Sequence, residues 1–245
     1  MAWNEEAFRP YFLYHYAALG ARITVFDNES TDATAEIAAS WPDTSVTSYS
    51  TATTLRGDVN SYIKSTAWRA SGAPFSDWVI CVDVDELVYH PNLREYLGDC
   101  DKEGYDIVVP TGFDMAAPAN ETNAMSEGRP LSRRGIPNAL YSKPVIFSSR
   151  RIEKVDFGPE AHTAQFSPEP RVKGNQIGAL RTKTLFPTTM YVEEVYPRMN
   201  DPLLLHYRFH DLDIVNRWRD RHARRSTVNR GLGMGHTMRS VLTCS

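Results

Sequence analysis

The chain has 245 residues, of which 42% are hydrophobic and 11% aromatic, and its formal net charge is −3 at pH 7. This length is ample for one α/β domain with a large core. The charge gives no overall basic field, so we expect no nucleic-acid partner. Three cysteines without a Cys-x-x-Cys pair argue against a disulfide framework or a zinc knuckle and indicate a reduced, cytoplasmic protein.

The sequence contains no signal for a membrane segment. No uninterrupted apolar stretch approaches the roughly 20 residues that a membrane-spanning helix requires. The first residues also lack the basic and then apolar regions of a signal peptide. We therefore expect no membrane span.

The first 90 residues alternate between strand and helix patterns. The expected elements are a helix over 8–19, a strand over 23–26, a helix from Ser30 or Thr31 to about Trp41, a strand over 46–49, a helix over 58–70 and a strand over 78–82. This alternation predicts an α/β fold with a mostly parallel central sheet flanked by helices. Ligands of such sheets bind beyond the carboxyl ends of the strands, where Asp27 and the pair Asp83 and Asp85 are expected.

After Pro91 the alternation becomes irregular. The expected elements are strands over 107–109 and 145–147, an apolar run over 203–207, a helix over 211–225 and a glycine-rich end over 231–235. Residues 116–138, rich in Pro, Gly, Asn and Ser, are expected to form a long acceptor-side loop. We expect one domain over 1–245, with a nucleotide-binding half over 1–90 and an acceptor-binding half over 91–245.

The run Asp83-Val84-Asp85-Glu86 follows the buried strand expected over 78–82. Residues i and i+2 of a strand share a face, and carboxylate oxygens suit a hard cation such as Mg²⁺ or Mn²⁺ that keeps positions open for phosphate. The motif alone leaves two readings open: a metal and diphosphate site, or two solvated carboxylates at a strand end.

Several separated motifs together resemble bacterial glycosyltransferase family 2 proteins of GT-A fold and their Asp-x-Asp-Glu subgroup. The matching pieces are Trp3-Asn4-Glu5-Glu6, Tyr11 to Tyr16, Asp27 to Asp32, Asp83 to Glu86, Ser142-Lys143-Pro144, His162 and Leu205-His206-Tyr207. The resemblance implies transfer of a sugar from a UDP- or GDP-sugar to a hydroxyl of a small molecule or glycan. It further implies an inverting reaction assisted by Mg²⁺ or Mn²⁺, and an irregular acceptor-side C-terminal half.

The resemblance also assigns site residues. Those implied for nucleotide-sugar binding are Asn4, Glu5, Asp27, Asn28, Asp58, Lys64, Asp83 and Arg225. Those implied for metal binding are Asp83, Asp85 and His206. Capping, turn or core roles remain the alternatives for Asn4, Asp27 and His206.

An inverting transfer also needs a base within reach of the acceptor hydroxyl. The leading candidates are His162, which matches a family position, and Glu160; Asp114 and Glu86 are further possibilities. The basic stretch over 217–230 could cover the donor diphosphate, because arginine presents a fork matched to phosphate. Within it, Arg225 matches the family pattern.

One feature departs from the resemblance. Relatives carry an apolar strand before the Asn-Glu pair, whereas only Met1-Ala2-Trp3 precede it here, so the first strand is either trimmed or minimal. Two other functions stay open. One is a nucleotide-sugar-binding protein without turnover, and the other is a phosphatase in which the first Asp of an Asp-x-Asp motif is a covalent nucleophile.

Overall fold

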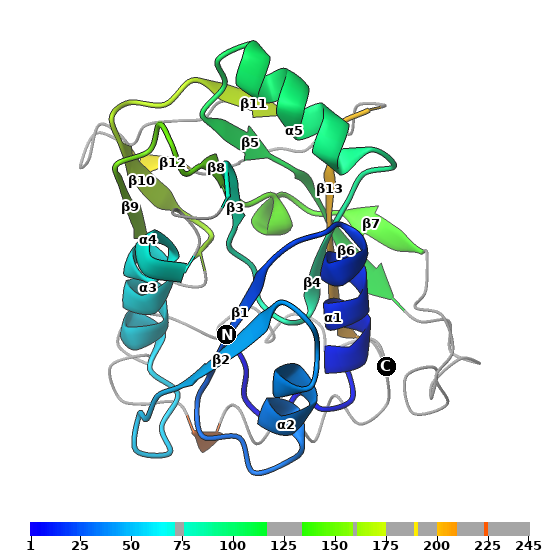
Figure 1. The fold of residues 1–245 in the computed structure, drawn as a ribbon, viewed down its shortest axis with the longest axis vertical. Helices are drawn as coiled ribbons and strands as arrows, with labels where there is room; N and C mark the ends of the chain where they lie inside the picture. Colours follow the sequence, from blue (N-terminus) through cyan, green and yellow to red (C-terminus); the bar gives the residue numbers. More distant parts are fainter. Residues whose placement is uncertain are drawn as a thin grey trace, which may run out of the picture.

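A computed structural model describes residues 1–71, 76–116, 134–158, 161–174, 189–190, 200–209 and 223–224 (Figure 1). The N-terminal part consists of α1 (Arg9–Ala18), β1 (Ile23–Asp27), α2 (Thr34–Ala39) and β2 (Thr44–Ser48). The strands β1 and β2 pair in parallel, with Val25 opposite Val46. Gly20, with φ of 67°, ends α1 in the left-handed conformation that glycine adopts without strain. The strand–helix–strand unit expected here is confirmed.

The next segment leads to the carboxylate motif. It comprises α3 (Gly57–Thr66), α4 (Trp68–Ser71) and β3 (Trp78–Ile80). The prediction of a single helix over 58–70 is wrong, because α3 ends at Thr66 and a separate helix, α4, begins at Trp68. The hydroxyls of Ser65 and Thr66 donate to carbonyls four residues earlier, and Trp68 Nε1 donates to Ser65 O, contacts that bend or end a helix.

All the other described strands, including β3, form three further sheets. Their elements are β4 (Glu86–Tyr89), β5 (Ile107–Val109), β6 (Thr111–Ala116), β7 (Gly135–Pro137), β8 (Ile146–Ser148), β9 (Lys154–Phe157), β10 (Ala164–Ser167), β11 (Val172–Gly174), β12 (Thr189–Met190) and β13 (Leu203–Phe209). The strand orders are β11-β5-β8-β3, β4-β13-β6-β7 and β12-β10-β9. The helix α5 (Leu93–Lys102) and the short 3₁₀ helix η1 (Ala139–Tyr141) complete the described elements.

The mostly parallel central sheet is confirmed only in part. The pairs β1 with β2, β5 with β11 and β6 with β13 are parallel. The pairs that β8 makes with β3 and β5, and that β13 makes with β4, are antiparallel. The sheets are therefore mixed because β8 and β13 run opposite to these neighbours, an arrangement that helical periodicity in the first 90 residues does not reveal.

The core lies where the helices cover the strands. In α5, the buried residues Leu93, Leu97 and Cys100 recur at helical spacing and belong to the same hydrophobic cluster as β5 and β8. A second cluster joins α1 and β1 to Leu87 and Tyr207. In Figure 1, α5 lies beside β5 and β11, α3 beside β9, and α1 and α2 beside the β1–β2 pair.

One further expectation differs from the structure at the start of α2, and another lies outside the described residues. The helix expected from Ser30 or Thr31 begins at Thr34, and neither of those residues caps it. Instead Asp32 Oδ1 accepts the Thr34 N–H, while the Ser30 hydroxyl donates to Asp27. The helix expected over 211–225 and the glycine-rich end lie outside the described residues, apart from 223–224. None of the described helices combines the length and the apolar character needed to cross a membrane.

Candidate functional site

The carboxylate motif forms a tight turn between β3 and β4. The Glu86 N–H donates to Asp83 O at 3.1 Å, and the Asp83 N–H donates to Glu86 Oε2 at 3.0 Å. Because the strand ends at Ile80, Asp83 and Asp85 do not project from one strand face as the sequence suggested. The two carboxylates instead contact different partners.

Asp83 is held by a lysine from α3. Lys64 Nζ lies 2.9 Å from both carboxylate oxygens of Asp83, and the lysine side chain is only 5% exposed. Burial opposes charge on both groups, yet the attraction between them lowers the pKa of Asp83 and raises the pKa of Lys64. Both groups are therefore charged at neutral pH, and each satisfies the other.

Glu86 and Lys143 form a second buried pair. Lys143 Nζ lies 2.5 Å from Glu86 Oε1, with the two side chains 3% and 1% exposed. Since the other carboxylate oxygen of Glu86 accepts the Asp83 N–H, this pair fixes the turn that carries the carboxylates. Glu86 is buried and both of its carboxylate oxygens hold the turn in place. Such a carboxylate does not suit a base that must reach an acceptor hydroxyl.

Asp85 faces β13 rather than α3. The Tyr207 N–H donates to Asp85 O at 2.8 Å, and antiparallel pairing places His206 opposite Glu86. As a result His206 Nε2 lies 3.6 Å from Asp85 Oδ2, and His206 Nδ1 is buried without a hydrogen-bond partner among the described residues. A separation of 3.6 Å is too long for a strong hydrogen bond.

Tyr141 connects His206 to the candidate base. Its ring stacks on His206 with centroids 4.0 Å apart and an interplanar angle of 27°, and its centroid lies 6.4 Å from that of His162. His162 Nδ1 lies 2.5 Å from Leu140 O. A carbonyl oxygen only accepts, so Nδ1 carries the proton and Nε2 is the basic nitrogen of the ring.

The nucleotide-side candidates Asp27 and Asn4 organise one loop. Asp27 is buried and accepts from the Ser30 N–H and hydroxyl, at 3.1 and 2.6 Å. Asn4, in the left-handed conformation with φ of 51°, accepts from the Thr31 N–H at 2.8 Å. These contacts match the turn-stabilising alternative for Asp27 and place both residues at the same loop.

The remaining nucleotide-side candidates have separate settings. The Glu5 N–H donates to the Thr34 hydroxyl at 2.7 Å, next to the loop that Asn4 binds. Asn28 is buried and hydrogen bonds to the Thr51 hydroxyl at 2.9 Å. Asp58 lies at the surface, where Arg56 binds both of its oxygens at 2.9 and 2.6 Å and lowers its pKa to about 2. The Asp58 carboxylate is therefore committed to an ion pair at the start of α3.

Tyr49 directly follows β2, and its N–H donates to Asp27 O at 2.9 Å. Its hydroxyl donates to Asn60 at 2.8 Å. Burial, followed by the negative charges of Asp83 and Asp27, raises the pKa of this hydroxyl.

The basic stretch reaches the same region through Arg224. Its guanidinium lies 3.8 Å from the centroid of the Trp3 ring, and Arg224 Nε donates to Thr53 O at 2.8 Å. The sequence singled out Arg225 within this stretch, but Arg225 and the candidate base Glu160 lie outside the described residues. The Trp3 ring, which can stack a cation, was the available signal for Arg224.

Arg9 is a residue that sequence reasoning missed. It is fully buried, and none of its three guanidinium nitrogens has a hydrogen-bond partner among the described residues. Burial lowers its pKa to about 10, against the opposing charges of Asp27 and Asp32. Arginine at the start of an amphipathic helix is ordinarily solvated, so no local pattern distinguishes it.

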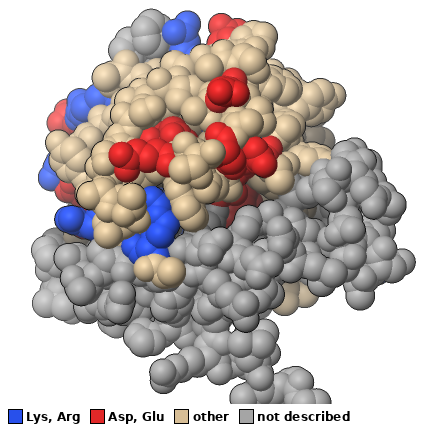
Figure 2. Space-filling model, turned by 90° about the horizontal axis from the view of Figure 1, so that it is seen from below, with Lys and Arg blue, Asp and Glu red and all other residues tan. Residues whose placement is uncertain are grey.

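The described residues contain no group of three histidine, cysteine or acidic side chains close enough to enclose a metal ion. Asp85 lies next to His206, whereas Asp83 forms an ion pair with Lys64. Figure 2 shows acidic side chains gathered across the middle of the described surface on the face seen from below, with lysine and arginine beside them. The described part of that face therefore carries charges of both signs.

Comparison with known proteins decides the family. A family model described as glycosyl transferase family 2 matches residues 3–152, which include the Asp27 loop and the carboxylate turn. The chain belongs to glycosyl transferase family 2. This confirms the resemblance, and the mixed α/β architecture agrees with the GT-A type of fold predicted from it.

A comparison of this glycosyl transferase family 2 chain with solved structures finds a more distant similarity. The solved structure of S. aureus TarS 1–349, in complex with UDP-GlcNAc, aligns at 14% identity with a TM-score of 0.43. The alignment covers 80% of this chain and 58% of the TarS 1–349 chain, so the chain spans a little over half the length of that solved chain. No curated protein matches the sequence.

Proposed function

We propose that the chain transfers a sugar from a nucleoside diphosphate sugar, a UDP- or GDP-sugar, to a hydroxyl of a small molecule or glycan. The proposal rests on one row of side chains in a member of glycosyl transferase family 2. Asp85 lies next to His206, His206 stacks on Tyr141, and Tyr141 lies beside His162. On the nucleotide side, Asp27 and Asn4 hold one loop, and Lys64 pairs with Asp83.

A divalent cation, Mg²⁺ or Mn²⁺, fits Asp85 and His206 in part. Ligands about 2.1 Å from one cation stand roughly 3–4 Å apart, which accommodates the 3.6 Å between Asp85 Oδ2 and His206 Nε2. A two-ligand protein site suits Mg²⁺ or Mn²⁺, because such ions keep positions for water and phosphate. When bound, the cation would neutralise charge on the leaving diphosphate.

His162 is the proposed base. The acceptor oxygen forms a bond to the anomeric carbon, the bond from that carbon to the diphosphate oxygen breaks, and the hydroxyl proton passes to His162 Nε2. Attack from the side opposite the leaving group gives inversion. Tyr141 keeps the ring of His206 in place between this base and Asp85 by stacking.

The proposal is tested by incubating the purified chain with UDP- and GDP-sugars, Mn²⁺ and a panel of hydroxyl acceptors, and measuring release of UDP or GDP. Release from one donor that rises with one acceptor supports transfer. Binding of a donor with no release under any condition would support the alternative of a nucleotide-sugar-binding protein. A covalent aspartyl phosphate would support the phosphatase alternative.

Replacement of His162 by alanine is expected to lower turnover by about 10²- to 10⁴-fold, because a general base acts in the transition state. Donor affinity, measured by calorimetry, should change little. The matched control is His90→Ala, since His90 precedes α5, where its Nδ1 accepts from the Asn92 N–H at 3.1 Å and its ring packs against Tyr96. Weakened donor binding with turnover retained at saturation would place His162 in the donor site instead.

A further inference from the structure

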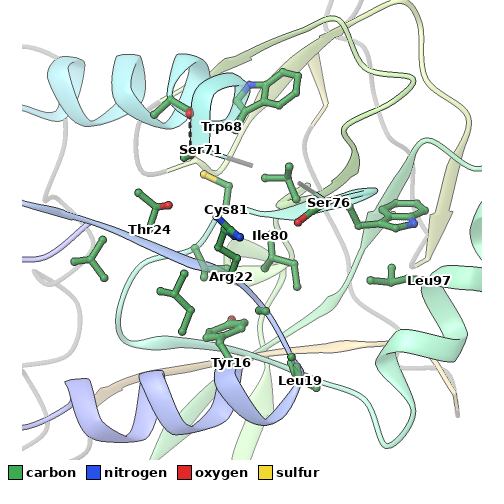
Figure 3. A pocket seen from close by; sticks show the side chains of 18 of the residues that line it. Tyr16, Leu19, Arg22, Thr24, Trp68, Ser71, Ser76, Ile80, Cys81 and Leu97 are labelled. Atoms are coloured by element: carbon green, nitrogen blue, oxygen red, sulfur yellow. Dashed lines mark hydrogen bonds between the residues drawn. The ribbon is translucent and has the colours of Figure 1, made fainter. Parts of the chain in front are cut away.

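The acceptor surface is separate from the cavity between β1 and β3. That cavity has a volume of about 620 Å³, and Tyr16 of α1 and Trp68 of α4 lie at its walls (Figure 3). None of the side chains from Asp85 to His162 that carry the proposed reaction lines it. An acceptor that reaches His162 therefore does not bind in this cavity.

One face of the sheet β4-β13-β6-β7 leads from the reaction site to the edge strand β7. The strand register places Glu86 of β4 and Asp114 of β6 on either side of His206. Ile136 of β7 lies opposite Asp114. Side chains of residues directly opposite one another in a sheet project to the same face. These four residues form what we call the cross-sheet row, which runs from buried Glu86 to Ile136, 68% exposed.

The other face of this sheet packs against α1. Leu87, Leu205 and Phe113 lie next to the cross-sheet row in sequence and therefore project to that other face. They belong to, or pack against, the hydrophobic cluster that includes Phe12 and Leu13 of α1. The face with His206 and the rest of the cross-sheet row is therefore the one left for a ligand.

The short helix η1 lies on the same face as the cross-sheet row. A Cβ atom at Gly112 would lie 2.1 Å from the Tyr141 carbonyl carbon and 2.3 Å from Ser142 N, so η1 covers the side-chain position of Gly112. Gly112 and Asp114 share this face of β6 and are about 7 Å apart along it. The helix η1, which carries Leu140, therefore lies beside the row at Asp114.

Ile136 and Leu140 are exposed aliphatic side chains on this face. Leu140 is 52% exposed, and its carbonyl oxygen lies 2.5 Å from His162 Nδ1. Exposed apolar side chains that gather at a site commonly mark a binding surface, because covering them removes apolar area from water. The other exposed large hydrophobic side chains in the described part of the chain are tyrosines, which carry a polar hydroxyl: Tyr14, Tyr62 and Tyr89.

We propose that Ile136 and Leu140 bind an apolar substituent of the acceptor, an aryl or alkyl group, while a hydroxyl of the same molecule reaches His162 Nε2. Because the Leu140 carbonyl holds the His162 ring, a substituent packed on the Leu140 side chain lies next to the base. The acceptor is then a hydroxyl compound with an apolar substituent rather than an unsubstituted sugar. This inference rests on the proposed transfer reaction and adds the acceptor class to it.

The kinetic test compares methyl, hexyl and p-nitrophenyl glycosides of glucose, galactose, mannose and N-acetylglucosamine as acceptors. Release of UDP or GDP is measured at saturating donor and Mn²⁺. The hexyl or p-nitrophenyl series is expected to have a KM about tenfold lower than the methyl series at similar kcat, because a contact made equally before and in the transition state changes binding alone.

Two variants and one control locate this effect. Ile136→Ser and Leu140→Ser should each raise the KM of the preferred series by about 3- to 10-fold and leave the KM of the methyl glycosides and the donor affinity unchanged. The control is Tyr14→Ser, since Tyr14 is 70% exposed on α1, the helix that covers the other face of the sheet. It should change none of these values.

Binding is followed without turnover through the NMR methyl signals of Ile136 and Leu140, assigned with Ile136→Val and Leu140→Val. In the presence of UDP or GDP and Mn²⁺, hexyl or p-nitrophenyl glycosides should shift both signals, and methyl glycosides should shift neither. Equal KM values in the three series, or signals that no glycoside shifts, would overturn the proposal. Equal release in all series would leave the transfer reaction standing, whereas bound donor without release in any series would overturn that reaction.

Discussion

Asp85→Asn is expected to reduce turnover by about 10³-fold while the fold is retained. The substitution removes a negative charge from the pair with His206, where the proposed cation would oppose charge on the leaving diphosphate. Asp85 lies in a turn and its side chain is 16% exposed, so the loss should not disturb the core. The measurement is release of UDP or GDP at saturating donor and Mn²⁺, together with the thermal unfolding midpoint.

The control for this variant is Asp99→Asn. Asp99 lies on α5, is 53% exposed and pairs with Lys102, so the control removes the same kind of carboxylate charge from an exposed helix pair. It should keep full turnover. If Asp85→Asn turned over at the wild-type rate with an unchanged dependence on Mn²⁺, Asp85 would have no role in binding a cation.

Lys143→Met is expected to lower the free energy of unfolding by about 3–5 kcal/mol. It leaves the Glu86 carboxylate charged, buried and without its cation, which is the costly outcome for an ion pair that is 3% and 1% exposed. Because Glu86 also accepts the Asp83 N–H, the carboxylate turn should loosen as well. Urea unfolding followed by circular dichroism measures the first effect.

The double variant Glu86→Gln with Lys143→Met separates the pair from its surroundings. It removes both charges, and it should recover most of the stability that Lys143→Met loses. Lys102→Met, which breaks an exposed pair with Asp99, should cost less than about 1 kcal/mol. Additive losses in the double variant would show that the two side chains do not stabilise one another.

Much of the N-terminal fold could be predicted from the sequence because its signals are local. The apolar spacing in α1, Gly20 after it and the β-branched residues of β1 each act through neighbouring residues. The strands that β8 and β13 each pair with could not be predicted. Such pairing depends on contacts between residues far apart in the chain, such as Ile80 with Ile146. A short apolar run predicts a strand, but it does not predict which strand it pairs with or whether the pairing is parallel.

The candidate site was predictable to the extent that motif spacing carries it. The sequence indicated Asp83, Asp85, His162 and His206 as site residues, and the structure brings Asp85 to His206 and joins both to His162 through Tyr141. The sequence did not reveal that Lys64 forms an ion pair with Asp83, because this pair depends on how α3 packs against the carboxylate turn. Their metal and catalytic roles stay predictions.

In the proposed reaction, Asp85 and His206 bind a divalent cation together with a nucleoside diphosphate. The most direct test is calorimetric titration of the purified chain with UDP, GDP, CDP and dTDP, each with and without Mn²⁺, for the wild type and Asp85→Asn. One nucleotide is expected to bind the wild type, Mn²⁺ is expected to strengthen this binding, and Asp85→Asn is expected to lose the effect of Mn²⁺. Binding that is equal with and without Mn²⁺, or absent for all four nucleotides, would contradict it.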